Sequence, residues 1–68
     1  MTAERIYRRH LNTLHYCARG SREFFQRHGF DWSDFLRNGI EREKFIETGD
    51  AMALRCVDVA DMEVNRGR

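Results

Sequence analysis

The 68-residue sequence contains no proline and a single lysine, Lys44, among its twelve basic residues. Valine, isoleucine and threonine are scarce and scattered, so no segment shows the alternating pattern that is typical of a strand. The chain is therefore predicted to be all-α. The other eleven basic residues are arginines, which favour planar, paired contacts with carboxylates or phosphates over a loosely solvated surface.

The sequence also lacks a run of about 20 apolar residues, which is the length that a membrane-spanning helix needs. Its N-terminal segment contains Arg5, Arg8 and Arg9 but no apolar stretch of the kind that a secretion signal carries. We therefore expect no membrane partner, and we expect the protein to be found in the cytoplasm of the cell that makes it.

Motifs for catalysis and metal binding are missing as well. There is no nucleophile elbow, glycine-rich phosphate loop or paired His-Glu motif, and so small a domain has little room for a water-excluding pocket. The histidines and cysteines match no zinc spacing. Cys17 and Cys56 occupy apolar helical positions, where buried, reduced thiols are expected and a disulfide is the alternative. The sequence therefore predicts a protein that is not an enzyme and holds no metal or cofactor.

Three glycines at a ten-residue interval, Gly29, Gly39 and Gly49, divide the second half of the chain. A glycine just past a helix adopts the left-handed conformation without a clash of its side chain. Asp31 and Asp50 follow two of these glycines and are suited to cap the next helix. The glycines are thus predicted to end short helices rather than to cradle a phosphate.

The apolar spacing predicts two longer helices that bracket a compact, aromatic middle. The first runs from about Ala3 to Arg19 with Thr2 as its N-cap, and it ends at the Gly20-Ser21 pair. The last runs from about Ala51 to Val64. Short helices are predicted between them, over about 21–28, 31–38 and 41–47. The expected fold is a small bundle of four to five helices.

A chain of this length buries only about 60% of the surface that its unfolded form exposes, so its stability is marginal. Good packing, a partner or self-association must supply the rest, and a homo-oligomer is one of the expected outcomes. We predict one domain over residues 1–65 and a frayed C-terminal tail over 66–68.

Charge is distributed unevenly along the chain. Residues 1–28 carry six arginines and two glutamates, whereas residues 29–63 carry nine carboxylates and four basic residues. The basic outer face of the predicted first helix, extended by an exposed aromatic residue, is our candidate for partner binding. Its predicted residues are Arg5, Arg8, Arg9, Arg19, Arg22 and Phe25. An acidic protein partner, a nucleic acid, and a solvated face paired with the acidic middle of the same chain remain open as interpretations.

Three segments carry a resemblance to a known group of proteins. They are Arg27-His28-Gly29-Phe30-Asp31-Trp32, Asp34-Phe35-Leu36-Arg37-Asn38-Gly39-Ile40 and Thr48-Gly49-Asp50-Ala51-Met52-Ala53. Over about residues 17 to 60 the chain resembles a family of small proteins encoded by temperate bacteriophages and prophages of Gram-negative bacteria. The resemblance implies a phage origin and transfers no functional residue.

Phage proteins of this size mainly act by binding. The expected function is therefore a small virion or assembly-associated component, found in the cytoplasm of the bacterial host or in the virion. The first alternative is an inhibitor of a host protein, such as an anti-CRISPR or other anti-defence protein. The second alternative is a small nucleic-acid-binding regulator, for which the short and acidic middle helices are a poor match to a helix-turn-helix.

Overall fold

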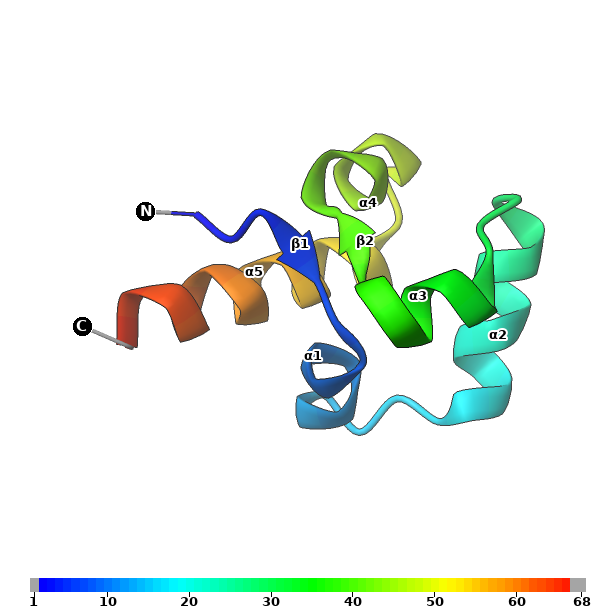
Figure 1. Cartoon of the computed structure of the whole chain (residues 1–68), viewed down its shortest axis with the longest axis horizontal. Helices are drawn as coiled ribbons and strands as arrows, with labels where there is room; N and C mark the ends of the chain where they lie inside the picture. The colour runs from blue at the N-terminus through cyan, green and yellow to red at the C-terminus, as the bar shows by residue number, and fades with distance from the viewer. Residues whose placement is uncertain (1, 67–68) are drawn as a thin grey trace.

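The computed structural model describes residues 2–66, and in this part of the chain it contains five helices and one short strand pair (Figure 1). The helices are α1 (Arg8–Thr13), α2 (Ala18–Arg27), α3 (Trp32–Asn38), α4 (Arg42–Thr48) and α5 (Ala51–Arg66). Strand β1 (Arg5–Ile6) pairs antiparallel with β2 (Ile40–Glu41), and Ile6 lies opposite Ile40. The prediction of a small, mainly helical bundle is confirmed.

The predicted helix from Ala3 to Arg19 is wrong, because this segment forms β1, then α1, and then the start of α2. Ile6 is fully buried beside Ile40. The extended strand pair therefore buries an apolar side chain that the spacing had assigned to the apolar face of a helix. His15 then adopts a φ of +60°, which a right-handed helix cannot accommodate. Of the two longer terminal helices that were predicted, only α5 exists.

Gly20 was predicted to end the first helix, but it lies inside α2. The helix begins earlier than expected because Cys17 caps it, with the Gly20 N–H donating to the Cys17 Sγ at 3.3 Å. Cys17 is therefore exposed rather than buried. Cys56 is buried as predicted, burial raises the pKa of its thiol to about 12, and both cysteines are free.

The interpretation of the other three glycines as helix ends is confirmed. Gly29, Gly39 and Gly49 all have positive φ angles and follow α2, α3 and α4. The two predicted aspartate caps also form: the Asp31 side chain accepts a hydrogen bond from the Asp34 N–H at 3.0 Å, and that of Asp50 accepts one from the Met52 N–H at 2.8 Å. The predicted Thr2 cap is wrong, because no helix begins at Ala3.

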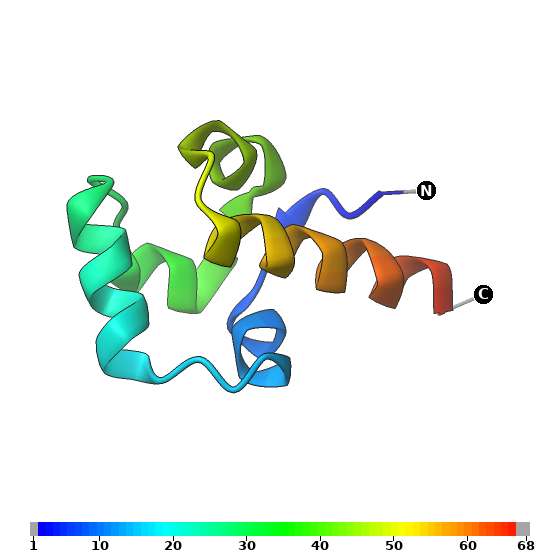
Figure 2. The ribbon, with the colours of Figure 1, turned by 180° about the vertical axis from the view of Figure 1, so that it is seen from behind.

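Aromatic rings from three helices form the centre of the core. Phe24 and Phe25 of α2, Phe35 of α3 and Phe45 of α4 are all buried, and the Phe25 and Phe35 ring centroids are 4.6 Å apart. The last helix, α5, packs small residues against this core, namely Ala53, Cys56, Val57 and Ala60. In Figure 2, α5 crosses the near face of the molecule, with β1 behind it and α1 below it.

The last helix extends to Arg66, two residues beyond its predicted end. The remaining residues of the predicted frayed tail, Gly67 and Arg68, lie outside the described residues. Within residues 2–66, no helix is long and apolar enough to cross a membrane.

Candidate functional site

The structure assigns an internal role to Arg5, the first residue of the predicted basic face. Its Nε donates to the carbonyl oxygen of Asn38 at 2.8 Å, and its Nη2 donates to that of Gly39 at 3.2 Å. These carbonyls lie at the C-terminal end of α3, where a cation compensates the negative end of the helix dipole. Arg5 therefore joins β1 to α3 and is not presented to a partner.

Arg8 is half-buried and bridges α1 to α3. Its guanidinium carbon lies 5.3 Å from the centroid of the Trp32 ring, within the range of a cation–π contact. Its Nε also donates to the Asn12 side-chain oxygen at 3.3 Å. The planar guanidinium thus packs against an aromatic residue of the same chain.

Arg9 belongs to a three-residue cluster that ties α1 to the C-terminal half of α5. Its Nη2 and Nε donate to the two carboxylate oxygens of Glu63 at 2.7 and 3.0 Å. These hydrogen bonds, together with a weaker one from His10, lower the pKa of Glu63 from 4.5 to about 2.

The third member of this cluster, His10, is buried. Its Nδ1 accepts a hydrogen bond from the Tyr7 backbone N–H at 2.8 Å, and its Nε2 lies 3.2 Å from the Glu63 carboxylate. Because Nδ1 accepts a hydrogen bond, Nε2 carries the ring proton and donates a hydrogen bond to the Glu63 carboxylate. His10 is therefore a hydrogen-bonded core histidine, as its position on the apolar side of the segment suggests.

Phe25 was predicted to be an exposed contact residue, and this prediction is wrong. Only 1% of its surface is exposed, because α2 turns this residue toward the centre of the molecule. Its ring packs edge-on against Trp32 at 5.1 Å between centroids, and it also contacts Phe30 and Phe45. A partner cannot reach Phe25 in the folded chain.

Arg19 and Arg22 are the two predicted site residues that remain available. Both lie on the solvent side of α2, opposite its buried residues Ser21, Phe24 and Phe25. The Arg19 side chain is 88% exposed, and its Nε lies 3.6 Å from the Glu23 Oε1. Because both side chains are exposed to solvent, this ion pair is weak. Arg22 is exposed and forms no hydrogen bond or ion pair with residues 2–66.

Arg27 joins these two residues on the same helix. It is exposed, and its guanidinium carbon lies 5.9 Å from the Phe24 ring centroid. It was not among the residues predicted for partner binding. We call this surface, formed by Arg19, Arg22, Glu23, Gln26 and Arg27, the α2 arginine face. Its formal charge is +2, from three arginines and one glutamate.

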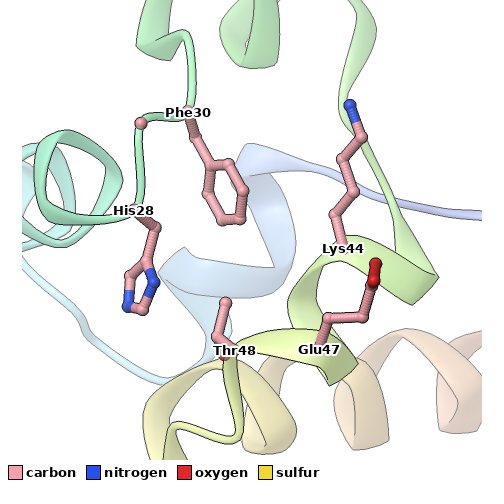
Figure 3. Close-up of a pocket in the computed structure, with 6 residues that line it drawn as sticks. His28, Phe30, Lys44, Glu47 and Thr48 are labelled. Atoms are coloured by element: carbon pink, nitrogen blue, oxygen red, sulfur yellow. The ribbon is translucent and has the colours of Figure 1, made fainter.

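A pocket of about 400 Å³ lies between the end of α2 and α4 (Figure 3). Its lining residues include His28, Phe30, Lys44, Glu47 and Thr48. The Thr48 hydroxyl is already engaged, because it donates to the Phe45 carbonyl at 2.7 Å and accepts from the Asp50 N–H at 3.1 Å.

The charged groups of this pocket do not converge. Figure 3 shows the Lys44 and Glu47 side chains extending from α4 away from the His28 ring. Among residues 2–66, no group of three or more histidine, cysteine or acidic side chains is placed to hold a metal ion. The α2 arginine face is therefore the better candidate for a functional surface.

Comparison with known proteins adds no further constraint. No protein-family model, curated protein or solved structure matches the chain.

Proposed function

We propose that this chain is a non-enzymatic binding module that recognises an acidic protein surface through the α2 arginine face. The observation that carries the proposal is the unequal use of the arginines. Arg5, Arg8 and Arg9 are committed to contacts inside the chain, whereas Arg19, Arg22 and Arg27 project from one helix without a strong acidic partner. Arginine is enriched at protein interfaces because its planar guanidinium pairs with carboxylates.

The resemblance to small phage proteins indicates the biological setting of this binding. We propose a virion or assembly-associated component, whose acidic partner is another phage protein. An inhibitor that binds an acidic surface of a host protein is the alternative, and it uses the same arginines. A pull-down from uninfected bacterial lysate separates the two, because capture of a single host protein favours the inhibitor.

The experiment that tests the surface reverses its charge. The double variant Arg19→Glu, Arg22→Glu should abolish capture of the partner and leave the far-ultraviolet circular dichroism unchanged, because neither side chain packs in the core. The matched control is Arg37→Glu, Lys44→Glu, which makes the same charge change at two exposed residues of α3 and α4. Equal loss of binding in both variants would indicate a non-specific charge effect and contradict the proposal.

Nucleic acid is the competing ligand for a face rich in arginine. Binding to phosphates would show as an affinity for labelled single-stranded or duplex DNA that falls steeply with added salt. A tight, strongly salt-dependent complex that is lost in the Arg19→Glu, Arg22→Glu variant would replace the protein-binding proposal with a nucleic-acid regulator.

A further inference from the structure

A second surface, independent of the α2 arginine face, lies on the outward side of α5. Its centre is a stripe of four residues at spacings of four, three and four, formed by Ala51, Arg55, Asp58 and Met62. Such spacing keeps side chains on one line of a helix. All four residues are exposed, and Met62 is 53% exposed. We call this line the α5 stripe.

The α5 stripe faces away from the rest of the fold. The opposite side of the same helix contributes Ala53, Cys56 and Ala60 to the core, each with 0% exposure. In Figure 2, α5 lies across the near face of the molecule, and no other element passes in front of it. A second helix can therefore approach the stripe without displacing any part of the chain.

The two charged residues at the centre of the stripe lack close partners. Arg55 forms no hydrogen bond or ion pair with residues 2–66, although it lies three residues from Asp58 on the helix. Asp58 has only a weak electrostatic interaction with Arg42, whose guanidinium is already paired with Asp61 at 3.0 Å. The centre of the stripe therefore carries one free positive and one free negative group.

We propose that a second copy of this chain binds the α5 stripe in an antiparallel, two-fold symmetric dimer. With the axis midway between Arg55 and Asp58, Arg55 of each chain faces Asp58 of the other. The same axis places Ala51 against Met62 of the second copy, so that a small residue meets a large one. In this single register, opposite charges face each other and small side chains face large ones across the two-fold axis. An isologous interface requires such self-complementarity.

Two apolar residues flank the stripe and extend this match. Leu54, which is 40% exposed, lies on one side of it, and Val59 lies half-buried on the other. In an antiparallel pair of helices with a two-fold axis, each side of the stripe meets the same side of the second copy. Leu54 then packs near Leu54, and Val59 packs near Val59, around the paired charges.

The net charge of the molecule does not oppose this association. The formal charge is +1, so two copies repel each other only weakly. A single helix pair is a small interface, and we expect a dissociation constant of roughly 10–100 µM. The dimer would also bury Met62 and Leu54, which adds to the apolar surface removed from water in a domain too small to bury much of its surface alone.

Sedimentation equilibrium of the full chain at concentrations up to about 1 mM tests the dimer. Arg55→Asp alone and Asp58→Arg alone place like charges opposite each other, and each should weaken the dimer by at least about tenfold. The double variant Arg55→Asp, Asp58→Arg restores opposite charges in the same register, so its dissociation constant should return to within about threefold of the parent.

Arg37→Asp is the matched control, because it makes the same charge change on α3, away from the stripe, and should leave the dimer intact. Circular dichroism of each variant confirms that the helices are retained. A monomeric parent chain, single variants that dimerise as tightly as the parent, or a double variant that dimerises no more tightly than the single variants would each overturn the proposal. Because the α2 arginine face is unaltered in all of these variants, partner binding and dimerisation can fail separately.

Discussion

Gly39 is the residue whose replacement the structure restricts most clearly. Its φ and ψ of +75° and −176° lie in a region that is essentially confined to glycine. A Cβ at this position would lie 2.7 Å from the Tyr7 ring and 2.8 Å from the Ile6 carbonyl oxygen. The β1 backbone therefore approaches the end of α3 only because this residue has no side chain.

We accordingly expect Gly39→Ala to lower the free energy of unfolding by more than about 2 kcal/mol, from backbone strain and from the clash with β1. Urea unfolding followed by circular dichroism measures this change. Gly49→Ala is the control: its φ is also positive, at +66°, but no atom lies within 4 Å of the added Cβ, so it should cost about 1 kcal/mol. Equal losses in the two variants would contradict the close approach at Gly39.

Single residues also show where sequence reasoning reached its limit. Gly29, Gly39 and Gly49 were assigned correctly because a left-handed helix end depends on local backbone chemistry. The arginines were not, because the sequence does not show that Arg5 meets carbonyls of α3 or that Arg9 meets Glu63, residues 33 and 54 positions away. Contacts within the chain therefore engage three of the five predicted contact arginines, Arg5, Arg8 and Arg9.

At the scale of elements, two ion pairs join α5 to α1 and to α4. Arg9 of α1 pairs with Glu63, and Arg42 of α4 pairs with Asp61 at 3.0 Å. Asp61 also accepts a hydrogen bond from the Ala3 N–H at 2.9 Å. Burial would raise the pKa of Asp61, but the hydrogen bonds from Arg42 and Ala3 outweigh it and hold the pKa below its ordinary value.

Both carboxylates therefore have a lower pKa in the folded chain than in the unfolded one. The stability they contribute is fully present above about pH 4.5, and it is lost as the pH falls toward the folded pKa of Glu63, about 2. We expect the urea midpoint to decrease over this window. The double variant Glu63→Gln, Asp61→Asn should be less stable at neutral pH and should lose less stability on acidification; an unchanged acid slope would show that other carboxylates dominate.

The elements themselves could be predicted in part. The ends of α3 and α4 follow from their glycines, and the starts of α3 and α5 follow from their aspartate caps. The N-terminal third could not be predicted in this way, since Ala3 and Ile6 are buried from an extended segment at a spacing that also fits a helix. A two-residue strand is too short to show alternation, and its pairing with Ile40 is visible only in three dimensions.

At the scale of the whole molecule, the fold depends on one aromatic cluster rather than on two bracketing helices. Phe24 and Phe25 reach the centre from α2, and Phe35 and Phe45 reach it from α3 and α4. A high aromatic content could be read as either a core or an interface. The structure assigns Phe25 to the core. The candidate binding surfaces are therefore the α2 arginine face and the α5 stripe.

This arrangement makes the domain sensitive to the loss of a single ring. A chain of 68 residues has a total stability of about 3–10 kcal/mol, from typical values per residue. Phe25→Ala removes a buried ring that contacts Trp32, Phe35 and Phe45 and should cost about 3–5 kcal/mol, which is a large share of that total. Thermal unfolding followed by circular dichroism should show a strongly reduced or absent transition.

Leu36→Ala is the control, because Leu36 is 47% exposed on α3 and its truncation should cost less than about 1 kcal/mol. If Phe25→Ala unfolded like the parent chain, Phe25 could not occupy the centre of the core, and its role as an exposed contact residue would have to be reconsidered.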